Sequence, residues 1–181
     1  MNSIEREFKT KISGIDYFRL MKKFELLDKA YVQENYYFDT PDFDLKNQDI
    51  TIRIRIKDWS IHLTKKEKGE NLTNEDTKNL SKDEANNLIN NGMAFKGYHI
   101  ENVASLKTTR AKTPYLDGVL FFDKNEYYNN VDYEIEYEIN DNVKYEDGEK
   151  TFLAFLDENG ITFQAQKSKS HRALEANKKS R

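Results

Sequence analysis

Apolar and polar residues alternate along most of the chain, and this pattern predicts a mostly β fold. From Ile50 to Lys57, four isoleucines alternate with Thr51, Arg53, Arg55 and Lys57. Successive side chains of a strand point to opposite faces, so this segment predicts a strand with one apolar and one basic face. Similar alternation predicts further strands, which cover residues 4–12, 31–38, 60–66, 106–112, 119–123, 132–139 and 161–169.

Helical patterns fill three of the segments between these strands, at residues 15–24, 81–92 and 151–158. The second helix begins at a capping box, Ser81-Lys82-Asp83-Glu84, whose serine and glutamate satisfy the first backbone amides. The polar stretch from Glu67 to Asn79 predicts a loop, and the basic end from Lys178 predicts a frayed tail. The chain contains neither a proline-rich linker nor a fixed repeat, so residues 1–181 are expected to form a single α+β domain.

Composition excludes several classes of protein. The 29 basic and 32 acidic residues give a net charge of -3, so we expect no stable nucleic-acid partner. The absence of cysteine excludes disulfides, thiolate metal sites and a cysteine nucleophile. No apolar run approaches the ~20 residues that span a bilayer. The sequence therefore predicts a cytoplasmic protein without a membrane partner.

Charged residues collect on one face of the predicted strands, often with one sign on each strand. Two interpretations stay open: the charged faces meet solvent, as in many antiparallel sheets, or the sheet closes and they line a lumen. Like charges on neighbouring strands repel, which favours bound counterions. The basic set then suits a polyanion and the acidic set a cation; they include Arg53, Arg55, Arg110, Lys112 and Glu5, Glu7, Glu134, Glu136.

An ordered set of motifs along nearly the whole chain resembles the CYTH domain family of the triphosphate tunnel metalloenzyme superfamily. The family's Glu-x-Glu-x-Lys signature corresponds to Glu5-Arg6-Glu7-Phe8-Lys9 near the N-terminus. The signature alone is a weak signal, whereas the ordered set is specific. The other matching segments are residues 36–41, 51–55, 63–66, 109–112, 133–138 and 167–174.

The resemblance implies an antiparallel, eight-stranded closed tunnel (a barrel) with helices packed outside, which binds a triphosphate. The residues that it implies for phosphate oxygens are Lys9, Arg53, Arg55, Lys66, Arg110 and Lys169, and parity alone adds Lys112. Those that it implies for Mg²⁺ or Mn²⁺ are Glu5, Glu7, Glu134, Glu136 and Asp123. Catalysis would then depend on Glu5, Glu7, Lys9 and Glu136.

Two positions have neighbouring alternatives. Lys65 replaces an apolar residue that is usual in the family, so either Lys65 or Lys66 could face inward, and we favour Lys66. Lys167 and Lys169 share parity, so either could be the last lysine of the tunnel. The three histidines show no metal-ligand spacing, although His62 could face the lumen.

The function expected from the resemblance is metal-dependent hydrolysis of inorganic triphosphate, thiamine triphosphate or a nucleoside triphosphate. An adenylate cyclase is one alternative, and a non-catalytic protein that binds nucleotides or polyphosphate is another. The acidic positions argue against a pure anion binder, because such a protein gains little from carboxylates. A small-molecule triphosphate is the expected partner, and an exposed aromatic strand edge could support a homodimer.

Overall fold

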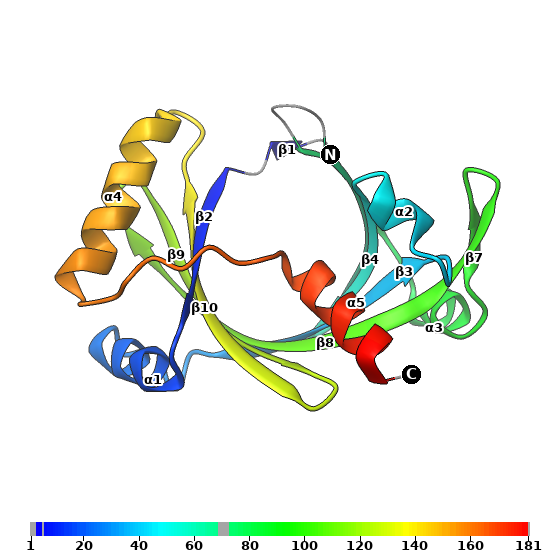
Figure 1. Ribbon diagram of the computed structural model, residues 1–181, viewed down its shortest axis with the longest axis horizontal. Coiled ribbons are helices and arrows are strands. Elements are labelled where there is room, and N and C mark those ends of the chain that lie inside the picture. The colour runs from blue at the N-terminus through cyan, green and yellow to red at the C-terminus, as the bar shows by residue number, and fades with distance from the viewer. Residues whose placement is uncertain (1–2, 5, 69–72, 181) are drawn as a thin grey trace. The chain divides into compact units, whose positions relative to one another are not determined.

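The computed structural model describes residues 3–4, 6–68 and 73–180, which form ten strands and five helices (Figure 1). Every pairing of strands whose register is defined is antiparallel, which confirms the predicted mostly β class, with ten strands in place of eight. The elements are β1 Ser3–Ile4, β2 Glu7–Ile12, α1 Gly14–Lys23, β3 Tyr31–Asp39, α2 Asp44–Asn47, β4 Ile50–Lys57, β5 Ser60–Lys68, β6 Thr73–Asn79, α3 Lys82–Asn91, β7 Met93–Phe95, β8 Tyr98–Tyr115, β9 Gly118–Tyr127, β10 Asn130–Ile139, α4 Tyr145–Glu158 and α5 Lys169–Ser180.

The described residues divide into two compact units, each with its own strands and its own apolar core. The order of strands is β1-β6-β5-β4-β3 followed by β8 in the first unit, and β8-β9-β10-β2 in the second. The units comprise residues 3–4, 33–68, 73–107 and 168–180 for the first, and 6–32 with 108–167 for the second. The long strand β8 therefore supplies residues to both. Of the helices in the described chain, none has the length and apolar character that crossing a membrane requires.

The core of the first unit forms on the isoleucine face of β4. Ile50, Ile52 and Ile54 are buried there, as the alternation predicted, and helices α2 and α3 add Leu45 and Ala85. Burying a side chain such as Ile54 completely is worth about 2 kcal/mol relative to leaving it exposed. The opposite face of β4 is thereby left to the polar residues Thr51, Arg53, Arg55 and Lys57.

The core of the second unit lies where α1 and α4 pack on the same side of β2, β9 and β10 (Figure 1). Aromatic rings dominate it: the Tyr137 and Phe152 rings stack with centroids 6.2 Å apart, and Phe24 packs on Phe155 at 6.1 Å. Ile135 and Tyr137 point into this core from β10, so the glutamates that alternate with them point to the other face.

Two helices begin at a serine cap, and the sequence predicts the cap of α3. In α3 both halves of the capping box form, since Glu84 N donates to Ser81 Oγ at 3.2 Å and Ser81 N donates to Glu84 Oε2 at 2.7 Å. Helix α3 ends at Gly92, which has a φ of +72° and where a Cβ would lie 2.3 Å from the Ile100 carbonyl oxygen. Ser13 caps α1 through its side chain, since Asp16 N donates to Ser13 Oγ at 3.0 Å.

The motif at residues 36–41 has a structural explanation in this chain. Asp39 is buried, and its carboxylate accepts hydrogen bonds from the backbone amides of Thr40, Leu45 and Lys46 at 2.8, 2.9 and 3.0 Å. These bonds satisfy amides at the start of α2 that have no partner within the helix. Asp39 thus fixes the connection from β3 to β4.

The prediction of a loop over Glu67–Asn79 is wrong, because β6 occupies its second part. The strand lacks apolar alternation and is held to β5 by polar pairs across the ladder. Thr64 Oγ1 lies 3.2 Å from Thr77 Oγ1, and Lys66 Nζ lies 3.1 Å from Glu75 Oε2. Cross-strand pairs of this kind stabilise a sheet without an apolar face.

The prediction of a strand over residues 161–169 is also wrong, and so is that of a frayed tail, because α5 begins at Lys169 and continues to Ser180. The preceding segment is extended but joins no ladder. Its Gln164 bonds to β2 through the backbone of Lys11 at 3.3 Å and the side chain of Thr10 at 2.8 Å. Alternation alone does not show whether an extended segment has a continuous partner strand.

Candidate functional site

Three carboxylates meet on the polar face of β9 and β10 in the second unit. Asp123 lies opposite Glu134 in the register, and Glu136 follows two residues later on the same face. One oxygen from each of these residues lies within 4.8 Å of the others. Asp123 and Glu134 are completely buried and Glu136 is 7% exposed. All three were predicted as metal ligands, and the register brings them together.

Arg110, on β8, is the cation inside this cluster. Its Nε and Nη2 donate to the two oxygens of Asp123 at 2.7 and 2.5 Å, and Nη2 also donates to Glu136 Oε2. Burial lowers the pKa of the guanidinium, but the attraction of Asp123 and Glu136 outweighs it and holds the pKa of Arg110 well above its usual value. The structure therefore places this predicted phosphate ligand among carboxylates.

Strand β2 brings the end of the Glu-x-Glu-x-Lys signature to the same face. Lys9 lies opposite Glu136 in the register, and Lys9 Nζ donates to Glu7 Oε1 at 2.8 Å. Both side chains are partly exposed, unlike the carboxylates of β9 and β10. Glu5, a predicted catalytic residue and metal ligand, lies outside the described residues.

Two amide side chains that the sequence analysis missed hold Glu134. Asn125 Nδ2 lies 3.3 Å from Glu134 Oε1 and 3.0 Å from Asp132 Oδ1, while Gln166 donates to the other oxygen of Glu134. Thr108 in turn donates to Asn125 Oδ1 at 2.8 Å. Asn125 has the parity of Asp123 on β9, so alternation could have found it. Gln166 comes from the extended segment before α5, and no local pattern marks it.

Among the described residues of this cluster, carboxylates outnumber cations. Glu7, Asp123, Glu134 and Glu136 lie near Lys9 and Arg110. Burial, followed by the nearby charges of Glu7 and Asp123, raises the pKa of Glu136 to about 7 even though Arg110 and Lys9 lower it. Carboxylate oxygens are ligands that a hard divalent cation prefers, so the donor set suits such a cation.

The raised pKa of Glu136 predicts how stability varies with pH in the metal-free protein. In the unfolded chain this carboxyl loses its proton near pH 4.5, whereas in the folded chain it keeps it to about pH 7. Stability is thus lost as the pH rises through this window. Glu136→Gln is expected to stabilise the protein by about 3 kcal/mol at about pH 8, and by less than about 1 kcal/mol at about pH 5. Urea unfolding in a chelator measures both values, and an equal gain at both would contradict the prediction.

A second charged face lies in the first unit, on the side of β4 and β5 away from the isoleucines. Its residues form rows across the sheet: Arg53 lies opposite Thr64, and Arg55 opposite His62. Lys66 lies opposite Glu75 on β6, and their side chains form an ion pair at 3.1 Å. Burial raises the pKa of Glu75, but Lys66, Arg53 and Arg55 together outweigh it and lower that pKa. The face is therefore cationic enough to hold an anion.

Lys66, and not Lys65, shares this face with the two arginines. Lys65 lies opposite Ile52 in the register and forms an ion pair with Glu67 at 3.0 Å. Its Nζ also lies 5.5 Å from the centroid of the Phe95 ring. The alternation of β5 is thus kept despite the unusual lysine, because that lysine pairs with a neighbouring carboxylate and an aromatic ring.

These neighbouring lysines make a matched pair for a test. Lys66→Ala is expected to raise the KM for the triphosphate that the family resemblance implies about tenfold, because a charge-assisted hydrogen bond is lost. Lys65→Ala is expected to change KM less than about twofold, since exposed ion pairs contribute little. Steady-state release of phosphate measures both. A larger effect of Lys65→Ala would show that the other face of β5 meets the substrate.

The remaining predicted residues belong to other segments of the chain. Lys112 is exposed on β8, and Lys169 is the first residue of α5 instead of the end of a strand. Lys167 is exposed in the segment that precedes α5. Of the histidines, His62 lies on the face of Arg55, as the sequence allowed, while His171 Nε2 lies 2.9 Å from Glu175 Oε1.

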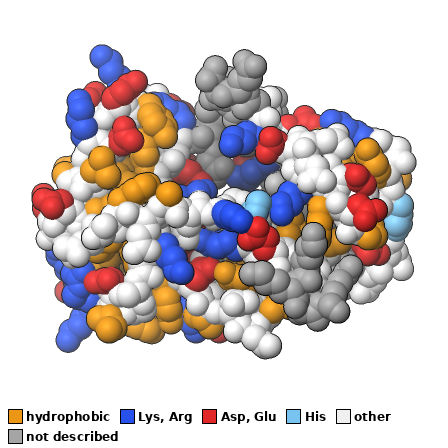
Figure 2. Space-filling view, viewed as in Figure 1, with side chains coloured by type: hydrophobic (Ala, Val, Ile, Leu, Met, Phe, Trp, Pro, Cys, Tyr) orange, Lys and Arg blue, Asp and Glu red, His pale blue; other side chains and the backbone are white. Residues whose placement is uncertain are grey.

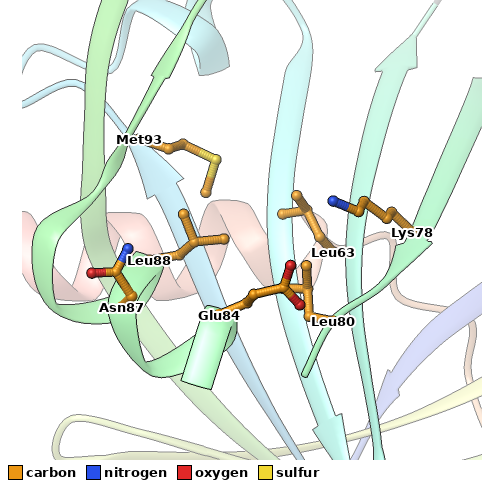
Figure 3. Close-up of a pocket in the computed structure, with 7 residues that line it drawn as sticks. All are labelled: Leu63, Lys78, Leu80, Glu84, Asn87, Leu88 and Met93. Carbon is orange, nitrogen blue, oxygen red and sulfur yellow. The ribbon is translucent and has the colours of Figure 1, made fainter. Parts of the chain in front are cut away.

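A cavity of about 260 Å³ lies in the first unit, on the other side of β5 from the cationic face (Figure 3). Four of its lining side chains are apolar, and Leu63 lies opposite Ile54 in the register. The lining residues are Leu63, Lys78, Leu80, Glu84, Asn87, Leu88 and Met93. A cavity with these walls does not suit a polyanion, so it is separate from the candidate site.

On the visible surface, acidic and basic side chains are interspersed (Figure 2).

Comparison with known proteins agrees with the architecture. The family model for the CYTH domain matches residues 3–174. YjbK of Bacillus subtilis (strain 168), named as a candidate triphosphatase, is 31% identical over 188 residues, which cover 98% of this chain and 97% of that protein. A candidate adenylate cyclase from Bacillus halodurans has a similar crystal structure, with a TM-score of 0.85, 29% identity and coverage of 94% and 97%. A Hippeastrum protein described as an adenylyl cyclase candidate with a dominant triphosphatase activity shares the fold, with a TM-score of 0.74, 20% identity and coverage of 97% and 96%.

Proposed function

The chain belongs to the CYTH domain family, and we propose that it hydrolyses a triphosphate with the help of Mg²⁺ or Mn²⁺. The substrate would be inorganic triphosphate, thiamine triphosphate or a nucleoside triphosphate. The observation that carries the proposal is the buried group of Asp123, Glu134 and Glu136, whose charge suits a divalent cation. The names of the relatives, triphosphatase in two cases, support the same reaction.

The proposed roles follow the two charged groups. Lys9, Arg53, Arg55 and Lys66 bind phosphate oxygens, and Lys112 and Lys169 are further candidates. Arginine suits this role through its planar fork and lysine through its compact charge. Arg110 could bind phosphate in two ways. It either keeps its bonds to Asp123 and Glu136 or exchanges them for bonds to phosphate oxygens. Glu5, Glu7 and the three buried carboxylates are the proposed metal ligands, of which Glu5 rests on the sequence alone.

Phosphoryl transfer needs positioned charge more than covalent help from the protein. A bound divalent cation supplies a Lewis acid for phosphoryl oxygens and lowers the pKa of a bound water. The residues of this chain supply the rest: Lys9, held 2.8 Å from Glu7, presents an ammonium group beside the carboxylates. Burial of Asp123 and Glu134 excludes water from their carboxylate oxygens, which strengthens the electrostatic interaction of these oxygens with a cation.

Adenylate cyclase is the second candidate function, and the description of the Bacillus halodurans relative favours it. Cyclisation would require room for a ribose and a base in addition to the triphosphate. Both reactions use the same charged residues, so the products must distinguish them.

A screen of product release across triphosphates, with Mg²⁺, with Mn²⁺ and with a chelator, tests the proposal. Release of phosphate that requires a metal is the expected result. Pyrophosphate together with a cyclic nucleotide would establish the cyclase instead. Tight binding without any product would establish a non-catalytic binder and overturn the proposal. A single domain over residues 1–181, a cytoplasmic location and a homodimer stay predictions.

A further inference from the structure

Asn35, on β3, is bonded to one of the two arginines of the cationic face. It lies opposite Arg55 in the register, and Arg55 Nε donates to Asn35 Oδ1 at 2.9 Å. The amide is buried, with 1% of the residue exposed. Only the oxygen of the amide can accept from Nε–H, so this bond also fixes which way the amide faces.

Arg53, two residues earlier on the same face of β4, has no such bond within the described part of the chain. It lies opposite Tyr37 on β3, and its buried Nε has no hydrogen-bond partner among the described residues. The two arginines look equivalent in the sequence because they share a strand, a face and a neighbourhood. In the structure, the Nε of Arg55 donates a hydrogen bond to Asn35, whereas the Nε of Arg53 bonds to none of the described residues.

The difference matters because a guanidinium group can hold an oxyanion by two edges. One edge presents Nε with one Nη, and the other presents the two Nη atoms. In Arg55 the bond to Asn35 occupies Nε and excludes the first edge. In Arg53 the first edge keeps its Nε donor.

We infer that Asn35 is a positioning residue, which fixes Arg55 so that it binds phosphate through its two Nη atoms. The inference rests on the proposed function, since it concerns the same cationic face. A neutral acceptor serves this purpose better than a carboxylate, because it orients the guanidinium without cancelling its charge. Fixing a long side chain before the substrate arrives also reduces the entropy lost on binding.

The unsatisfied half of the amide supports this assignment. Asn35 Nδ2 is buried and has no hydrogen-bond partner in the described part of the chain, which destabilises the fold. An apolar side chain of the same shape, such as leucine, would remove that penalty. A polar group kept at a stability cost indicates a role other than packing, and the bond to Arg55 supplies one.

A double-mutant cycle tests the inference by calorimetric titration of inorganic triphosphate in a chelator, which removes metal and prevents turnover. Asn35→Leu is expected to weaken binding about tenfold, the loss of one hydrogen bond to a charged group. The effect should vanish in an Arg55→Ala background, because no guanidinium is left to position. It should persist in full in an Arg53→Ala background, which is the matched control.

Equal losses from Asn35→Leu in the two backgrounds would overturn the inference, since a structural defect acts on both. If Asn35→Leu does not fold, Asn35→Ser replaces it, because its hydroxyl is too short to reach Nε, and the same pattern is expected. The proposed function fails separately, if the unmodified protein does not bind triphosphate or if Arg55→Ala leaves its affinity unchanged. In metal-dependent turnover, Asn35→Leu should raise KM and leave kcat within about twofold, whereas a disordered site would lower kcat.

Discussion

Replacing Glu134 with glutamine is expected to lower kcat/KM for metal-dependent triphosphate hydrolysis by about a thousandfold, or about 4 kcal/mol in transition-state free energy. The side chain is completely buried within a group whose carboxylate oxygens lie within 4.8 Å of one another. Glutamine keeps the shape but removes one negative charge, so the affinity for a divalent cation falls with the turnover. Phosphate release and calorimetric titration with Mn²⁺ measure the two effects.

Glu126→Gln is the matched control for that change. Glu126 lies next to Asn125 on β9 but on the opposite face, where it forms an ion pair with Lys124 at 3.3 Å. Its replacement is expected to leave both turnover and metal affinity within about twofold, as for other surface pairs. Wild-type turnover in Glu134→Gln would show that the buried carboxylates are not the metal site.

The alternation of apolar and polar residues predicted most strands and the two faces of each. It separated the two faces of β4, and it assigned Glu134 and Glu136 to one face and Ile135 and Tyr137 to the other. Side-chain parity is a local property, so a single sequence reveals it. Which strands become neighbours is not local, and here the family resemblance supplied the expectation that the acidic residues converge.

The errors about strands share one physical cause, which is that pairing with another strand, and not the pattern within the segment, decides the outcome. Strand β6 is polar and forms because Thr77 and Glu75 meet Thr64 and Lys66 on β5. The segment before α5 looks like a strand, but it is not assigned to a strand and bonds to β2 through Gln164.

The residues that position the site were not predicted from the sequence, because their roles also depend on strand pairing. Asn35 and Asn125 are ordinary amides until the register sets them beside Arg55 and Glu134. The same holds for Arg110, which was expected to bind phosphate, whereas its hydrogen bonds are to two carboxylates. The roles of amides and ion pairs that act across strands can therefore be predicted only when the strand pairing is known.

Arg110→Met is expected to destabilise the metal-free protein by about 3–5 kcal/mol, because it leaves buried carboxylates without their cation. Asp123 has no exposed side-chain surface, and Arg110 satisfies both of its oxygens. Methionine fills a similar volume, so packing against the Phe121 ring, which lies 4.6 Å from the guanidinium carbon, is largely kept. Urea unfolding at neutral pH in a chelator measures the loss. Lys124→Met, which breaks an exposed ion pair, should remain within about 1 kcal/mol.

The same variant links stability to the proposed metal site. Removing Arg110 takes away the positive charge that is paired with Asp123 and Glu136, which leaves their oxygens available to a bound cation. A cation that binds only the folded state stabilises it in proportion to its affinity, so Mg²⁺ should raise the unfolding midpoint of Arg110→Met more than that of the unmodified protein. Equal shifts in the two proteins would mean that the cation binds away from Asp123 and Glu136. A midpoint in the chelator equal to that of the unmodified protein would mean that the Arg110 ion pairs contribute no net stability.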